Sequence, residues 1–266
     1  MDANSLFRAG QLNEAVSASL QFVKSNPLDV GGRLFLAELL CFQADWERAE
    51  RQLETVTKQS KDDAFFALLV RQLICGEIQR EQVFLEGRAP HLVGELPLDA
   101  KLQLEACTEL RQKQSAAELV AQAEAARKPV PGVADEQGFD NIRDLDDRLA
   151  GVLEVITTTG KYYWVPWSSV KVLEFHPAER PVDLIWRKAS IEVENGPEGD
   201  VFVPVRYPNA ASENWDDQLR LGRATSWLGD EGEAVVGIGQ RMLLIGEEAK
   251  AILDVSKITI STSEPS

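Results

Sequence analysis

The 266-residue sequence is short of the residues from which metal sites and catalytic relays are commonly built. It contains two histidines, His91 and His176, and three cysteines, Cys41, Cys75 and Cys107. Two imidazoles exclude a histidine-rich metal site. The cysteines are odd in number and far apart, which is typical of small buried hydrophobic residues and not of a zinc site with Cys-x-x-Cys pairs. We therefore expect no metal and no cofactor.

Basic residues and long apolar runs are also scarce. Lys and Arg total 28 against 43 Asp and Glu, a net charge of −15, so the chain would neutralise neither nucleic acid nor an anionic membrane surface. The N-terminus lacks a basic segment followed by an apolar one, and no apolar run reaches the roughly 18 residues of a membrane span. We predict a cytoplasmic protein with no nucleic-acid partner and no membrane insertion.

Helical periodicity runs through residues 1–127. Gly10 and Ala44 are 34 residues apart, and so are Ala15 and Ala49. Small residues at this period are a tetratricopeptide pattern, because paired helices approach closely there. Two such units cannot bury a superhelical core alone, so we expect the later helices to continue the stack and cap it. An irregular helical domain with an accidental repeat is the alternative.

The pattern changes after residues 128–139, a segment with two prolines and two glycines that we interpret as a linker. Residues 140–266 then consist of short β-branched or aromatic runs, several with period-two alternation, separated by Gly, Pro or Asn. The sequence predicts an α+β protein. Helical hairpins fill 1–127, and a mainly antiparallel β domain, a curled sheet or partial barrel, fills 140–266.

An acidic motif opens the second half of the chain. Asp144 and Asp146 have the spacing that begins a calcium loop, but Arg148 stands where a third oxygen ligand would be. Unpaired buried charges are costly, so we favour a charged turn in which Arg148 pairs with a neighbouring carboxylate. Carboxylates acting as acid and base stay open as an alternative. With Arg206 and Tyr207 they would form the site of an enzyme of unknown class.

Aromatic residues are concentrated in residues 140–266, which hold five of the six tryptophans. Large aromatic side chains either fill the core of a small sheet or act as hot spots at a protein interface. We assign a structural role to Trp164, Trp186 and Trp227. For Tyr163 and Trp167 both interpretations stay open.

Two surfaces are candidates for binding a partner. Stacked helical hairpins form a groove that can accept a helix or a peptide, and the second half offers its aromatic residues. The predicted contacts are Phe7, Leu34 and Glu38 in the groove, and Tyr163, Trp167, Arg206 and Tyr207 in the second half.

Seven strings of the sequence, in order along nearly the whole chain, resemble the ImpE family, also called SciE or TagJ, of accessory proteins of bacterial type VI secretion systems. They are RLFLAELLCFQADWERAERQLE, DLDDRLAGVLEVI, GKYYWVPW, DLIWRKA, VPVRYP, TSW and GQRMLL. One departure is Ala150-Gly151 after Arg148-Leu149, where the family tends to have Gly-Pro.

The resemblance implies a helical-repeat domain followed by an α+β domain, and no enzymatic activity. It also implies binding to the sheath subunit TssB, through its N-terminal segment, and association with the sheath-disassembling ATPase ClpV. The implied role is an adaptor that tunes recycling of the contractile sheath. An enzyme of unknown class and a purely structural protein that forms oligomers are the alternatives.

Overall fold

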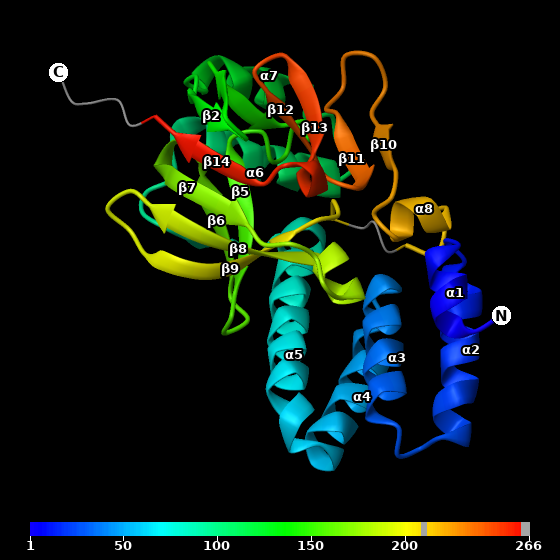
Figure 1. Cartoon of the computed structure of the whole chain (residues 1–266). Coiled ribbons are helices and arrows are strands. Elements are labelled where there is room, and N and C mark those ends of the chain that lie inside the picture. Colours follow the sequence, from blue (N-terminus) through cyan, green and yellow to red (C-terminus); the bar gives the residue numbers. More distant parts are fainter. Residues whose placement is uncertain (209–211, 262–266) are drawn as a thin grey trace.

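The computed structural model describes residues 1–208 and 212–261. A layer of helices packs against one face of a large sheet (Figure 1). The helices of this layer are α1 (Ala3–Arg8), α2 (Leu12–Ser25), α3 (Val30–Phe42), α4 (Trp46–Gln59) and α5 (Lys61–Glu81), which continues into the short π-helix η1 (Gln82–Glu86). None of the described helices combines the length and apolar character that a transmembrane segment requires.

The first two helical hairpins have similar turns and similar buried positions at the 34-residue spacing. Gly10, in the turn between α1 and α2, and Ala44, in the turn between α3 and α4, both have positive φ angles, of 81° and 54°. Ala15 and Ala49 are both fully buried where the paired helices meet. These equivalent positions favour a true repeat over an accidental one.

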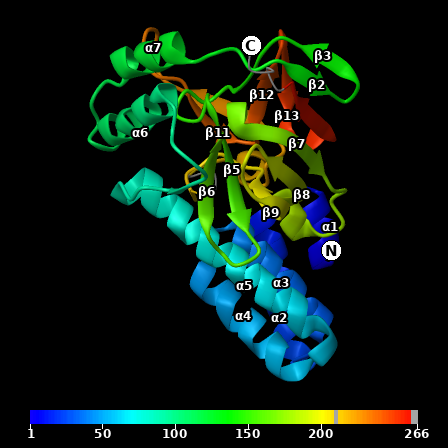
Figure 2. The same cartoon turned by 90° about the vertical axis from the view of Figure 1, so that its left-hand side faces the viewer.

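The last two helices do not continue this stack. α6 (Leu98–Arg111) and α7 (Ala117–Ala126) pack against each other beside the sheet, away from α2 to α4 (Figure 2). Ala106 of α6 and Ala116 form a small apolar cluster with Ala234 of the second half. The expectation of a continuous helical stack up to residue 127 is therefore wrong, because these helices bury their small apolar residues against the second half.

The main sheet has the strand order β1-β6-β5-β9-β8-β7-β14-β2-β3, and every neighbouring pair is antiparallel except β1 and β6. Its strands are β1 (His91–Leu92), β2 (Gly132–Ala134), β3 (Gln137–Phe139), β5 (Val152–Thr157), β6 (Tyr162–Pro166), β7 (Val170–Phe175), β8 (Trp186–Val193), β9 (Glu198–Pro204) and β14 (Lys257–Ile260). Two smaller sheets join β4 (Ile142–Asp144) with β12 (Met242–Ile245) and β13 (Glu248–Ala251), and β10 (Thr225–Leu228) with β11 (Val236–Gly239). The predicted α+β class, helical hairpins followed by a mainly antiparallel sheet, is confirmed.

The segment 128–139, predicted as a linker, contributes to the sheet. β2 pairs with β14, and β3 pairs with β2 through a turn in which Asp135 and Glu136 both have positive φ. Its glycines and prolines therefore mark an edge hairpin. β1 lies inside the range predicted as helical and pairs with β6, so the sheet draws on both predicted domains.

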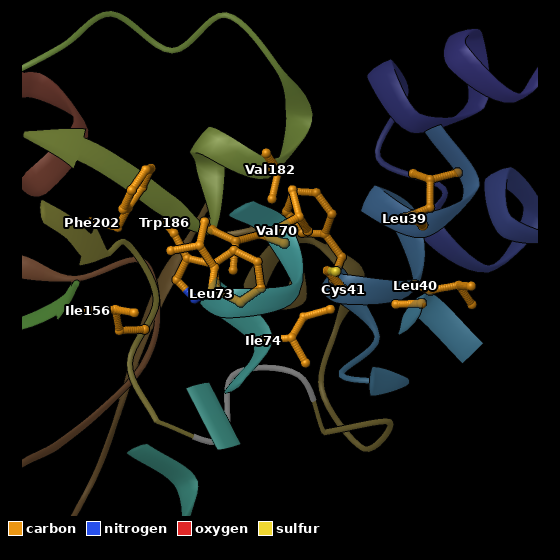
Figure 3. Packing of buried hydrophobic residues seen from close by; sticks show 14 of the residues in the cluster. Leu39, Leu40, Cys41, Val70, Leu73, Ile74, Ile156, Val182, Trp186 and Phe202 are labelled. Carbon is orange, nitrogen blue, oxygen red and sulfur yellow. The ribbon is translucent and has the colours of Figure 1, made fainter. Parts of the chain in front are cut away.

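Both faces of the central strands are buried. Ile156, Trp186 and Phe202 belong to the core shared with the helical layer: Leu73 of α5 lies beside Trp186 in Figure 3, and Ile156 lies directly against Gly76 of α5. The residues between them in the strands face a second core, formed with β4, β12 and β14. Alternate residues of one strand thus serve two cores, as the period-two pattern predicts. The second core contains Leu153, Val155, Val165, Ala189, Ile191, Val201, Val203, Leu243 and Ile258.

Candidate functional site

A cluster of buried charges joins α5 to the sheet, with Glu154 of β5 at its centre. Arg80 of α5 donates to both carboxylate oxygens of Glu154, at 2.7 and 2.9 Å. The Tyr162 hydroxyl also donates to this carboxylate, and the guanidinium of Arg241 pairs with it. Glu154 and Arg241 are fully buried, and burial lowers the pKa of Arg241 to about 10. Three donors thus compensate one carboxylate deep in the molecule.

Indole groups extend this cluster. Trp186 donates from Nε1 to Glu77 at 2.7 Å, and the other oxygen of Glu77 accepts from Arg80 at 2.9 Å. Trp164 donates to the Tyr162 hydroxyl at 2.5 Å. The structural role predicted for Trp164 and Trp186 agrees with this geometry, because both side chains are fully buried and hydrogen-bonded. Trp227, the third tryptophan of that prediction, is 40% exposed.

The acidic motif forms a buried charged turn. Arg148 donates to Asp146 from Nε at 2.9 Å and from Nη2 at 2.6 Å, and the Gly237 N–H donates to the same carboxylate. The pairing predicted for Arg148 is confirmed. Asp144 accepts from the Tyr207 hydroxyl at 2.8 Å and lies 3.4 Å from Arg241. Burial raises the pKa of Asp144 to about 6.

Arg206 closes the C-terminal end of α3. Its Nη1 donates to the carbonyl oxygens of Phe42, the last residue of α3, and of Arg220. Burial lowers the pKa of Arg206 to about 10. A cation is favourable at this end of a helix, so Arg206 acts as an internal cap. Within residues 1–208 and 212–261, no cluster of His, Cys, Asp or Glu has the arrangement of a metal site.

The chain itself fills the groove predicted for a partner. The 3-10 helix η3 (Pro181–Leu184) lies against α3, and Val182 joins the cluster that contains Val70 and Cys41 (Figure 3). Arg180 donates to Glu38 of α3 at 2.8 and 3.2 Å and stacks over the ring of Phe66 of α5 at 4.1 Å. Burial raises the pKa of Glu38.

A second segment covers the other end of the groove. In the short helix α8 (Asp217–Arg220), Asp217 accepts from the Leu12 N–H at 2.8 Å and so caps α2. Arg223 donates to the carbonyl oxygen of Phe7 and lies 5.3 Å above its ring. The second half of the chain therefore folds back onto the helical hairpins.

Most of the predicted partner contacts are consequently interior residues. Six of the seven are at most 7% exposed: Phe7, Leu34, Glu38, Trp167, Arg206 and Tyr207. Tyr163 is partly exposed and stacks on His91 of the neighbouring strand, with ring centroids 5.1 Å apart. The expectation that the six form an accessible surface is wrong for this structure, because η3, α8, the second core and, at Tyr207, the β10–β11 hairpin cover them.

Other apolar side chains are exposed instead, and we did not single them out from the sequence as contacts. Phe65 and Leu68, three residues apart on α5, are 80% and 48% exposed. For Phe65 and Leu68, the sequence offers one signal of exposure: the predicted helix that contains them carries apolar residues on more than one side.

Trp227, expected to be structural, is 40% exposed and packs one side of its ring near Tyr207, with ring centroids 5.7 Å apart. Beside Trp227, Leu228 lines a cleft of about 610 Å³ between η1, α6 and the β10–β11 hairpin.

The comparisons with known proteins agree with the resemblance seen in the sequence. The family model of the ImpE protein matches residues 136–259. Over 275 aligned residues the chain is 32% identical to the type VI secretion system accessory component TagJ of Pseudomonas aeruginosa, covering 99% of this chain and 92% of that protein. The chain belongs to the ImpE family.

The fold of this ImpE-family chain also occurs in an experimental structure. The X-ray crystal structure of protein VPA1032 from Vibrio parahaemolyticus superposes with a TM-score of 0.89, covering 98% of each chain at 29% identity. The packing of helical hairpins against a mainly antiparallel sheet is therefore shared over almost the full length of both chains.

Proposed function

We propose that this chain is a non-enzymatic, cytoplasmic adaptor of a bacterial type VI secretion system. In this proposal it binds the sheath subunit TssB, through the N-terminal segment of TssB, and tunes sheath disassembly by the ATPase ClpV. The observation that carries the proposal is 32% identity over 99% of the chain with a type VI secretion system accessory component.

The internal chemistry of the chain supports binding over catalysis. The polar residues that could have formed an active site are buried and hydrogen-bonded within the chain: Asp146 to Arg148, Asp144 to Tyr207, and Arg206 to backbone carbonyl oxygens. A general base must lie within hydrogen-bond reach of substrate, whereas the carboxylates of Asp144 and Asp146 are fully buried. Their arrangement is that of a structural network.

The outer face of α5 supports a specific contact surface for the adaptor. Phe65 and Leu68 form an exposed apolar spot on the last helix of the stack, which lies in front of the helical layer in Figure 2. Exposed large apolar residues that adjoin one another mark interaction sites, and an apolar helix face is a common docking surface for another helix. We propose that the TssB segment packs on this spot. The net charge of −15 suits a basic, amphipathic segment.

Calorimetric titration of the chain with TssB, and with its N-terminal segment as a peptide, tests this proposal. The double variant Phe65→Glu/Leu68→Glu is expected to weaken binding by about tenfold or more, because it places charge in the centre of the contact. Leu28→Glu is the matched control, since Leu28 is 81% exposed in the loop between α2 and α3.

The outcomes test the three parts of the proposal one by one: the adaptor role, the α5 surface and the link to ClpV. If TssB does not bind the unmodified chain, the adaptor role fails. If TssB binds equally well to the double variant and the control, the role stands but the α5 surface is excluded. The rate at which ClpV disassembles assembled sheaths, measured with and without the chain, then tests the regulatory part: an unchanged rate would remove ClpV from the proposal.

A further inference from the structure

The cleft between η1, α6 and the β10–β11 hairpin has apolar walls and two cationic groups. Its volume is about 610 Å³, within the range of pockets that hold small organic ligands. Phe84 of η1, Leu110 of α6 and Leu228 of β10 form the apolar walls. We refer to it below as the η1–α6 cleft.

The first cationic group is Arg148, whose side chain is 7% exposed and lines the cleft. Its Nε and Nη2 donate to Asp146, and its guanidinium lies 5.1 Å above the ring of Phe84. Its Nη1 makes no hydrogen bond within the part of the chain that the structure describes, and it is not sealed from solvent. A buried arginine thus keeps one end of its donor fork free beside the cleft.

The second cationic group is Arg111, in the last turn of α6. Its guanidinium lies directly against Gly87, where a Cβ atom would be 2.4 Å from Nη1, and Gly87 has a φ of +77°. Among the described residues Arg111 has no carboxylate within ion-pair distance. The absence of a side chain at residue 87 therefore leaves room for a guanidinium whose charge is not neutralised locally.

Two carboxylates stand on the β10–β11 side of the cleft. Glu233 accepts from the Ser115 hydroxyl at 2.7 Å, and Asp230 lies in the loop between the two strands. They repel an anion at that side, so an anionic group must lie against Arg111 and Arg148. They also define the competing possibility, an amine ligand held by the acidic side.

We propose that the η1–α6 cleft binds an aliphatic carboxylate, with the anion on Arg148 and Arg111 and the apolar chain along Phe84, Leu110 and Leu228. Arg111 supplies a charge without a carboxylate partner, and Arg148, whose charge is paired with Asp146, supplies a free N–H donor from Nη1; a carboxylate can accept from both guanidinium groups. This site goes beyond the adaptor function and does not depend on it. The ligand chemistry is shared by two sources, a free aliphatic acid and the C-terminus of a peptide that ends in an aliphatic residue.

Calorimetric titration of the full chain with octanoate, octanol and octylamine tests the proposal, because the three ligands share one chain length and differ in charge. Octanoate is expected to bind about tenfold more tightly than octanol, and octylamine more weakly than octanoate. Arg111→Gln is expected to weaken octanoate binding by about fivefold and to leave octanol unchanged. Arg88→Gln is the control, since the exposed Arg88 follows η1 and bonds to Gln82 outside the cleft.

A peptide arm distinguishes the two sources. Acetyl-Ala-Leu-Leu with a free carboxyl terminus is compared with its C-terminal amide and with octanoate. A peptide acid that binds more tightly than both supports a protein C-terminus as the ligand, whereas tighter binding of octanoate supports a free aliphatic acid. Octanol or octylamine binding as tightly as octanoate, or no binding of either acid up to about 10 mM, would overturn the proposal.

Discussion

The two faces of the central strands are buried by different chemistry. The face toward the helices holds Glu154, Tyr162 and Trp164, whose polar atoms bond to Arg80, Arg241 and one another. The opposite face of the same strands is mainly aliphatic. A charged residue on this face, Arg187 near the start of β8, donates to the backbone carbonyl oxygens of Ile252, Leu253 and Val255.

This difference separates two ways of holding a layer in place. Aliphatic side chains attract one another without direction, so the second core tolerates changes that conserve volume. A buried carboxylate with arginine partners has one geometry, and losing one partner leaves an unpaired charge in the interior. We infer that the charged face determines how α5 sits on the sheet, and that the aliphatic face supplies stability with less positional demand.

The largest effect is expected for Glu154→Ala. It leaves Arg80 and Arg241 buried without their shared carboxylate, which is expected to lower the free energy of unfolding by about 3–5 kcal/mol. Urea unfolding followed by tryptophan fluorescence measures the change. Tyr162→Phe removes one hydrogen bond from the same carboxylate and is expected to cost about 1 kcal/mol. A loss below about 1 kcal/mol for Glu154→Ala would erase the distinction between the two faces.

Leu153→Ala, on the aliphatic face of the same strand, is expected to cost about 3 kcal/mol, because it leaves a cavity in the second core. Leu153→Met conserves volume and is expected to cost less than about 1.5 kcal/mol. Both values come from the same urea titration. Equal losses for the two variants would show that the second core is as geometrically demanding as the charged face.

Glu81, which lies beside the charged cluster, is expected to make the free energy of unfolding depend on pH. Burial, and then repulsion by Glu77, raises the pKa of Glu81 from 4.5 to about 7, while Trp46 donates to its carboxylate at 3.2 Å. Because the folded state holds the proton more tightly than the unfolded state, stability is expected to fall as the pH rises through this interval. Glu81→Gln removes this titration.

Between about pH 5 and pH 8, the unmodified chain is expected to lose about 1 kcal/mol more than Glu81→Gln, a value reduced by solvent screening at this partly buried site. Urea midpoints of both proteins at the two pH values measure the difference. Parallel loss of stability in the two proteins would assign the pH dependence to other groups, such as Asp144.

The smallest effect is expected for Lys188→Ala. By the alternation of β8, Lys188 lies on the same face as Trp186, but it pairs with Asp200 at 2.8 Å with both side chains more than 40% exposed. Its loss is expected to change the free energy of unfolding by less than about 0.5 kcal/mol, because water screens the pair. A loss near that of Glu154→Ala would show that position on the face, and not burial, determines the cost.

Much of the fold follows from patterns that are local in the chain. Asp29 and Asp45 each cap the helix that follows them, and period-two alternation marks the central strand β8. The cap of α2 could not be predicted, because Asp217 supplies it from 205 residues away. The hairpin at 128–139 could not be predicted either, because its glycines and prolines are also typical of a linker.

The candidate site shows the same division. Neighbouring residues were enough to predict the pairing of Arg148, since Asp146 lies two positions before it. The contacts that bury Glu38 and Phe7 come from Arg180 and Arg223, which lie far along the chain. Periodicity and capping act within one element, so they determine the class of structure. Which faces stay accessible depends on long-range packing of one half of the chain against the other, and this decided that Phe65 and Leu68 stay exposed.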